Sequence, residues 1–229
     1  MVTGSADPVL ALEGSQRTAS VALRVGSDID VERVDPEVHL DDELVPATAR
    51  LLRRNGVDIR GVRTLAVSIG PGGFTGLRIS IAAAKMWAAV SGAEVLAVPT
   101  AAVVARGTAG LPERGRIAVA LASKRGTAWI TVLEREAGGP WSVPGTPGLM
   151  DASGVSGLRV DAAVADRYLP DDIRQIFSDS QINIIDPGFD ARACIQVVAF
   201  DVSLPTSTPP ERLLPLYPRE PEAVTRWRD

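Results

Sequence analysis

Short apolar runs separated by turn residues open the chain. Residues 9–12, 19–25 and 29–34 form three such runs, and the turns between them hold Glu13-Gly14-Ser15 and Gly26-Ser27-Asp28. Tight links between consecutive strand-like runs are typical of an antiparallel meander. The chain is therefore predicted to begin with three antiparallel strands.

The apolar spacing then changes to that of a helix. Leu40, Leu44, Ala47 and Leu51 recur every three or four residues, which predicts a helix over 41–54. Acidic residues fill its first turn and arginines its last, as the helix dipole favours. Asn55-Gly56 is expected to end the helix, and Pro46 removes one backbone donor inside it.

Strands and helices alternate in the next segment. A buried strand is predicted over 65–69, a glycine-rich loop over 70–76 and a helix over 77–90. A strand over 95–98 and a helix over 99–106 follow. The first hundred residues thus read β-β-β-α-β-α-β-α, and the fold class is α/β.

The pattern becomes more irregular after Gly107. Paired strands are predicted at 117–121 and 127–133 around Lys124-Arg125-Gly126, and residues 138–157 read as loops with short strands. The last predicted elements are a strand at 162–165, a helix at 171–177, a strand at 182–185 and a helix at 190–202. We predict one lobe over 1–105, a smaller second lobe over 106–204, and a proline-rich tail over 205–229 that lies extended on the body.

The helix over 77–90 is apolar around most of its circumference. One stripe holds Ile79, Ala83, Met86 and Val90, and a second holds Leu77, Ile81, Ala84 and Ala88. A helix of this kind needs cover on more than one side. Either it is central within its own domain, or it joins the helix 41–54 in a subunit interface, where Ser80, Ala84 and Ala88 would let another helix approach closely.

The glycine-rich loop before that helix has two interpretations. Backbone N–H groups at a helix start can hold a phosphate, and the candidate residues are Ser15, Gly72, Gly73 and Thr75. However, no Gly-Lys-Ser/Thr closes the loop, and its glycines miss the dinucleotide-binding spacing. A tight structural turn is the alternative.

Composition and charge narrow the class of protein. The 229 residues are 45% hydrophobic and 23% charged, and the formal net charge of -4 gives no global basic field for nucleic acid. Cys194 is the only cysteine, so the chain has no internal disulfide and no thiolate metal cluster. The start lacks the pattern of a signal peptide, and the run 77–90 is too short to span a bilayer. We expect a cytoplasmic protein that is not in a membrane.

Side chains that usually carry catalysis are scarce. His39 is the only histidine, so a His-x-x-x-His metal site cannot form within the chain, and we expect a solvated residue before a helix. No catalytic or metal-binding residue is predicted. Lys124-Arg125 is either a phosphate contact or a solvated hairpin tip. The remaining candidates are predicted to be packing residues: Cys194, Trp129, Trp141 and Trp227.

The central motif of the chain resembles that of a known family. The segment Ser68-Ile69-Gly70-Pro71-Gly72-Gly73-Phe74-Thr75-Gly76-Leu77-Arg78-Ile79, with Ala82-Ala83-Ala84-Lys85, resembles the TsaB (YeaZ) family. The opening hairpin with Glu13, Ser15 and 19–23 is similar to that of the family. So is the tail, through Leu216-Tyr217-Pro218-Arg219, Pro221-Glu222-Ala223 and Trp227. Residues 107–205 match only in layout.

The resemblance implies a fold and a role. The fold is actin-like and sugar-kinase-like (ASKHA, ribonuclease H-like), with two lobes. Members of the family are non-catalytic partners of the catalytic TsaD subunit and of the ATPase TsaE in making threonylcarbamoyladenosine in tRNAs that read codons beginning with A. Mapped here, the pairing helices are 41–54 and 76–90. The interface residues are then Leu44, Ala47, Leu51, Ile79, Ser80, Ala83, Ala84 and Ala88.

Two departures from the family pattern bear on cofactors. Glu13-Gly14-Ser15 stands where members usually have Asp-Thr-Ser, and Ala122-Ser123-Lys124-Arg125-Gly126 stands where Asp-Ala-Arg-Arg-Gly is common. We therefore expect that the chain binds no cofactor of its own and that ATP or ADP binds only at a joint with the partner. Because the chain is acidic overall, we expect it to contact tRNA only indirectly. The same surface would support a homodimer in isolation. The alternative is an independent ATP-dependent phosphotransferase that uses 13–18 and 70–76.

Overall fold

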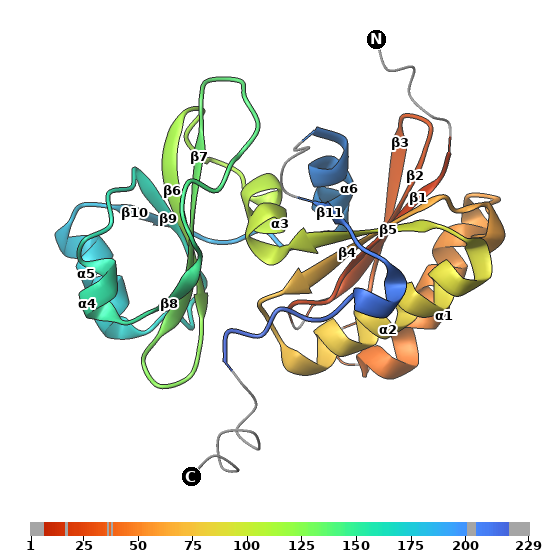
Figure 1. Ribbon diagram of the computed structural model, residues 1–229, viewed down its shortest axis with the longest axis horizontal. Helices are drawn as coiled ribbons and strands as arrows, with labels where there is room; N and C mark the ends of the chain where they lie inside the picture. Colours follow the sequence, from red (N-terminus) through yellow and green to blue (C-terminus); the bar gives the residue numbers. More distant parts are fainter. Residues whose placement is uncertain (1–6, 17, 36, 38, 201–204, 220–229) are drawn as a thin grey trace.

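Two β-sheets and the helices packed on them make up the molecule (Figure 1). The computed structural model describes residues 7–16, 18–35, 37, 39–200 and 205–219. The predicted α/β class, with an actin-like fold in two lobes, agrees with this architecture.

The first sheet has six strands in the order β11-β5-β4-β1-β2-β3. The N-terminal meander is confirmed, because β1 pairs antiparallel with β2 and β2 with β3, while β4 runs parallel to β1 and β5 parallel to β4. The strands are β1 (Val9–Glu13), β2 (Ser20–Val25), β3 (Asp28–Arg33), β4 (Thr64–Gly70), β5 (Glu94–Pro99) and β11 (Thr206–Ser207).

The second sheet repeats the strand order of the first. Its order is β10-β9-β6-β7-β8, so a three-strand meander is again followed by two parallel strands. The strands are β6 (Gly115–Ala122), β7 (Ala128–Arg135), β8 (Gly148–Met150), β9 (Ala162–Val164) and β10 (Asn183–Ile185). The molecule is thus built from two copies of one supersecondary unit.

Helices separate and cover the two sheets in layers. α1 and α2 lie on the outer face of the first sheet, α3 and α6 lie between the sheets, and α4 and α5 cover the outer face of the second (Figure 1). Each layer boundary holds one apolar cluster of the core. The helices are α1 (Leu40–Arg54), α2 (Phe74–Ser91), α3 (Thr100–Gly107), α4 (Ala152–Val155), α5 (Asp171–Asp179) and α6 (Ala191–Phe200).

Two boundaries differ from the sequence-based prediction. The predicted second lobe includes α6, but this helix packs against β1, β2 and α3, where its apolar face meets the inner face of the first sheet. α2 begins at Phe74, immediately after Gly73, instead of at residue 77. The loop is therefore only Pro71–Gly73 long beyond the strand.

The described part of the tail, residues 205–219, lies on the body and is tied to the first sheet. β11 pairs antiparallel with β5, and the short 3-10 turn Pro210–Arg212 follows. Leu213 is buried in the cluster beneath α1 and α2, and the Leu216 N–H donates to the Ile69 carbonyl at 2.7 Å. The tail segment 220–229, with Trp227, lies outside the described residues.

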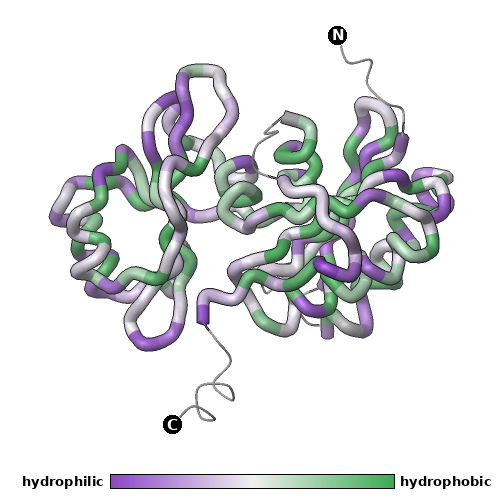
Figure 2. Tube along the Cα trace, viewed as in Figure 1, coloured by the Kyte–Doolittle hydropathy of each residue, from purple (hydrophilic) through white to green (hydrophobic). Residues whose placement is uncertain are grey.

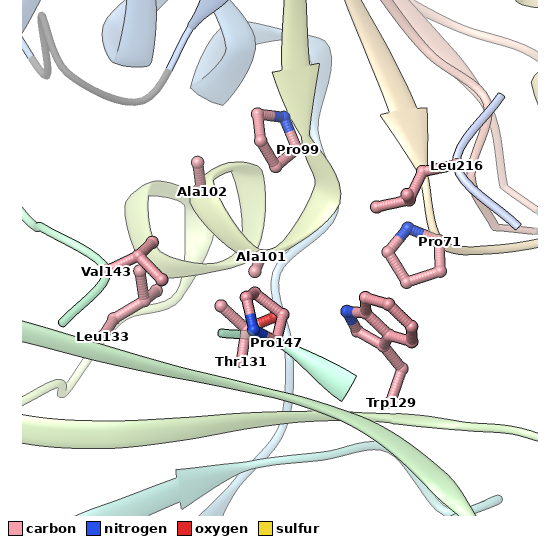
Figure 3. Close-up of a pocket in the computed structure, with 10 residues that line it drawn as sticks. All are labelled: Pro71, Pro99, Ala101, Ala102, Trp129, Thr131, Leu133, Val143, Pro147 and Leu216. Atoms are coloured by element: carbon pink, nitrogen blue, oxygen red, sulfur yellow. The ribbon is translucent and has the colours of Figure 1, made fainter. Parts of the chain in front are cut away.

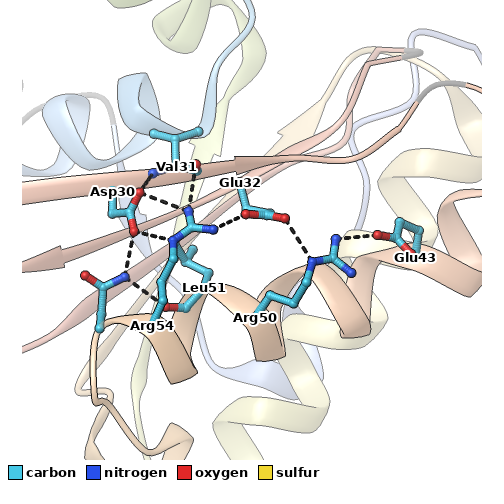
Figure 4. Close-up of polar contacts among 8 residues, drawn as sticks. Asp30, Val31, Glu32, Glu43, Arg50, Leu51 and Arg54 are labelled. Carbon is cyan, nitrogen blue, oxygen red and sulfur yellow. Dashed lines mark hydrogen bonds and ion pairs between the residues drawn. The ribbon is translucent and has the colours of Figure 1, made fainter.

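An ion network fixes α1 to β3 at the edge of the first sheet (Figure 4). Arg54 donates to Asp30 at 2.6 Å and also to Glu32, and Arg50 bridges Glu32, at 2.9 Å, and Glu43. The pKa of the Asp30 carboxyl falls to about 2, chiefly because Arg54 donates hydrogen bonds to it. These groups are partly exposed, so solvent screens the pairs and each contributes little to stability. They orient the helix more than they stabilise it.

Candidate functional site

The turn after β1 and the glycine-rich turn after β4 lie against each other. β1 and β4 are neighbouring parallel strands, so both turns leave the same edge of the sheet. A Cβ on Gly72 would lie 2.3 Å from the Ser15 carbonyl oxygen, and one on Gly76 would lie 2.2 Å from that of Gly14. Only glycine allows backbones to approach this closely.

This contact uses groups that a phosphate would need. The Gly73 N–H donates to the Ser15 carbonyl at 2.7 Å, and Ser15 is fully buried. Gly72, Gly73 and Thr75 are exposed, and Thr75 lies in the first turn of α2. The structure therefore brings all four candidate phosphate residues together, but the chain's own backbone occupies the N–H of Gly73.

Glu13 ends β1 as a buried carboxyl. It is 1% exposed, and its Oε1 accepts a hydrogen bond from the Ser15 N–H at 2.7 Å. Burial raises the pKa of the Glu13 carboxyl above its usual value, although hydrogen bonding to Ser15 acts in the opposite direction. A carboxyl that burial drives toward its neutral form is poorly suited to hold a metal–phosphate complex.

An apolar cavity of about 130 Å³ lies between the two lobes (Figure 3). Pro71, Pro99 and Leu216 enclose it from the first lobe and the tail, and Trp129 and Thr131 enclose it from β7. None of the described residues that line it is charged. The cavity is thus an apolar joint between the lobes and offers nothing to a phosphate.

A wider cleft of about 580 Å³ opens on another side of the interlobe joint. Gln16 and Thr18 face it from the β1–β2 turn, while Asp166 and Asp186 face it from the second lobe. The guanidinium of Arg167 lies 5.0 Å from the ring of Tyr168. Arg167 also lines the cleft, so two carboxylates and one guanidinium leave it with a single net negative charge.

Most of the residues predicted for the subunit interface are inside the subunit. Seven of the eight are buried, and they pack α1 and α2 on the sheet; these are Leu44, Ala47, Leu51, Ser80, Ala83, Ala84 and Ala88. Ile79 is partly exposed. The small residues let the helices approach their own sheet. These seven residues are therefore buried within the subunit and do not form an exposed interface.

Other apolar residues of the same two helices face outward. Met86 and Val90 on α2 are 48% and 50% exposed, and Val45 on α1 is 46% exposed. On α2, positions 79, 82, 86 and 90 follow helical spacing and share one face. α1 packs beside α2 (Figure 1), and the exposed positions of both helices lie on sides that the sheet does not cover. We call this surface the outer face; its residues are Val45, Ala49, Ile79, Ala82, Met86 and Val90.

The remaining candidates occupy the expected kinds of place. His39 is exposed immediately before α1 and makes no capping hydrogen bond with its side chain. Cys194 is fully buried, and burial raises the pKa of its thiol. Trp141 is buried and Trp129 half-buried, and Lys124 and Arg125 are exposed at the β6–β7 turn.

Metal-binding clusters and membrane-spanning helices are both missing from the described ranges. No group of three or more His, Cys, Asp or Glu side chains within those ranges is arranged to hold a metal ion. Within the same ranges, no helix has the length and apolar character needed to cross a membrane.

One cluster was not predicted from the sequence. Phe74 and Tyr217 stack with ring centroids 5.3 Å apart, and Arg78 lies over the Phe74 ring at 3.7 Å. Phe74 and Arg78 are one helical turn apart, and this spacing could have predicted the contact between them. Nothing in the sequence pattern placed Tyr217 beside them.

Comparisons with known proteins find similarity to proteins of threonylcarbamoyladenosine formation. The profile of the family described as "TsaD: tRNA N6-adenosine threonylcarbamoyltransferase" matches residues 37–133. The Escherichia coli (strain K12) "tRNA threonylcarbamoyladenosine biosynthesis protein TsaB" is 25% identical over 134 residues, which cover 58% of this chain and 58% of that relative. The alignment thus spans less than two thirds of the relative.

Solved structures show the same fold. A Pseudomonas aeruginosa protein described as uncharacterized, with similarity to peptidase YeaZ, superposes with a TM-score of 0.75 at 22% identity, covering 93% of this chain and 100% of its own. YeaZ from Pseudomonas aeruginosa gives a TM-score of 0.72 at 19% identity, covering 92% and 99%. At these identities the likeness establishes the fold alone.

Proposed function

We propose that this chain is a member of the TsaB (YeaZ) family and a non-catalytic subunit of the cytoplasmic machinery that forms N6-threonylcarbamoyladenosine in tRNAs reading codons that begin with A. In this role it binds and stabilises the catalytic TsaD subunit and works alongside the ATPase TsaE. The names of the Escherichia coli relative and of the matching family support the pathway.

The observation that carries the scaffold role is the outer face. Half-exposed Val45, Met86 and Val90 lie on two neighbouring helices whose other sides are already packed on the sheet. Contiguous apolar patches on a protein surface mark interaction sites more often than isolated apolar residues do. A helix pair of the partner can therefore complete a helix bundle on this surface. In isolation, a second copy of the chain would cover it.

The closed glycine turn argues against catalysis by this chain alone. The Gly73 N–H is bonded to the Ser15 carbonyl, and the Glu13 carboxyl is buried with a raised pKa. We propose that any ATP or ADP in the assembly lies at a joint with the partner, and that tRNA is held chiefly by the catalytic subunit.

Reconstitution tests this function. TsaD and TsaE should form threonylcarbamoyladenosine in tRNA only when this chain is added, and Met86→Asp should reduce the yield. The control Val25→Asp introduces the same charge at another exposed apolar position, 37% exposed at the end of β2, and should leave the yield unchanged. Titration calorimetry of the lone chain with ATP and magnesium completes the test. Binding with turnover would instead support an independent phosphotransferase.

A further inference from the structure

The aromatic cluster at the start of α2 is bound to the tail by several contacts. Phe74 and Tyr217 stack at an interplanar angle of 29°. Arg78 lies over the Phe74 ring, and its Nε donates to the Tyr217 hydroxyl at 2.9 Å. Phe74 is still 50% exposed. A cation and two aromatic rings are thus held together at the surface.

The tail joins this cluster to the β6–β7 turn of the second lobe. Arg219 donates through Nη2 to the Lys124 carbonyl at 3.2 Å and to the Thr127 hydroxyl at 2.9 Å. Arg125 is exposed at the tip of the turn, where its φ is 61°. Figure 2 shows that the turn and the end of the described tail are both hydrophilic. We call this surface the tail patch; its residues are Phe74, Arg78, Arg125, Tyr217 and Arg219.

Three of the five residues of the tail patch are arginines. Arginines 33, 50, 54 and 116 pair with carboxylates. Among the described residues, no ion pair involves Arg78, Arg125 or Arg219. The net charge of the whole chain is -4. Three arginines gathered on one surface of a chain that is acidic overall are suited to an anionic ligand.

We propose that the tail patch binds single-stranded RNA. Its arginines would contact phosphates, and unpaired bases would stack on the aromatic and guanidinium groups, which is how proteins commonly hold single strands. A duplex keeps its bases stacked and offers only phosphates. The inference rests on the proposed function for the source of the RNA, which is the unpaired loop of a tRNA. It places a direct, secondary RNA contact on a chain that is acidic overall.

Fluorescence anisotropy of the full-length chain tests the proposal. The probes are a labelled RNA hairpin with an unpaired loop and a blunt RNA duplex of the same length. Arg125→Glu at the exposed turn should weaken hairpin binding. It should also lower the slope of log affinity against log salt by about 0.7, because one phosphate is no longer neutralised. Phe74→Ala should weaken hairpin binding at least about fivefold, because one base can no longer stack, and should leave the salt slope unchanged.

A matched control is Arg114→Glu, which makes the same charge change at an exposed residue next to the opposite end of β6. It should leave hairpin binding intact. Equal weakening by Arg114→Glu, equally strong duplex binding, or no hairpin binding would each overturn the proposal. So would the finding that Arg125→Glu impairs only TsaD pairing, which would make the patch a protein contact. TsaD pairing is measured on the same variants, so loss of RNA binding with pairing intact leaves the proposed function standing.

Discussion

Glu13 illustrates how one side chain changes what a turn can do. The sequence pattern predicted its place at the end of a strand, and its departure from Asp-Thr-Ser suggested a weakened nucleotide site. Its complete burial was not predictable, because it depends on the later segments that pack over the turn. Burial raises the pKa of this carboxyl, so its charge state couples to folding.

The raised pKa of Glu13 gives a pH-dependent stability. The unfolded chain loses this proton near the ordinary glutamate value, while the folded chain keeps it to higher pH. The stabilising contribution is therefore full below the unfolded pKa and is lost as pH rises through the folded pKa. Glu13→Gln cannot titrate, and its stability relative to the parent should increase with pH across this interval. Urea unfolding at a series of pH values measures it.

The exposed Glu94 supplies the control for this experiment. Glu94→Gln makes the same chemical change at a position that is not buried, so an effect of pH equal to that of Glu13→Gln would show that burial is not the cause. A flat difference between Glu13→Gln and the parent over the whole interval would mean that the carboxyl titrates in the folded chain as it does in the unfolded one.

Among the elements, the glycine turn after β4 is constrained by its close approach to the turn after β1. Gly72→Ala puts a Cβ 2.3 Å from the Ser15 carbonyl, so one of the two backbones must move. We expect a loss of roughly 1–3 kcal/mol in the free energy of unfolding, as for other overpacked sites. Gly61→Ala, where nothing lies within 4 Å of the added Cβ, should change stability far less. Chemical denaturation compares the two, and equal losses would show that the approach is not tight.

α2 shows where periodicity reaches its limit. The sequence predicted a helix with two apolar stripes, and the structure confirms both. Periodicity alone did not say which stripe meets the sheet, because a helix that is apolar all round has no marked polar side. The stripe with Leu77 and Ala84 turns inward, whereas the other stripe is divided, because Ala83 is buried and Met86 and Val90 face outward. That assignment moved the candidate interface to new residues.

The complete fold repeats one strand order in two lobes, and the sequence did not reveal this repeat. The second lobe has short strands of three residues, β8, β9 and β10, which give weak alternation signals. The position of α6 was also missed, because its packing on the first sheet is set by the chain's return between the lobes. The tail was predicted as an extended surface segment, but its pairing with β5 depends on contacts across the molecule.

Leu213 anchors the tail to the body, and its neighbour provides the comparison. Leu213 is 1% exposed in the cluster beneath α1 and α2, whereas Leu214 is 68% exposed. Leu213→Ala should lower the free energy of unfolding by about 2–5 kcal/mol, as for other buried leucines. Leu214→Ala should stay within about 0.5 kcal/mol of the parent. Similar effects of both would show that the tail is not held by this side chain.

The scaffold role depends on the outer face of α1 and α2, and the affinity of that face for TsaD decides it. Titration of TsaD with the parent chain, with Met86→Asp and with the control Val25→Asp should show tight binding by the first and the last. Circular dichroism checks that each variant is folded. A charge on the apolar surface should weaken binding by Met86→Asp at least about tenfold, or roughly 1.4 kcal/mol. Equal affinity of all three chains for TsaD would contradict the scaffold role.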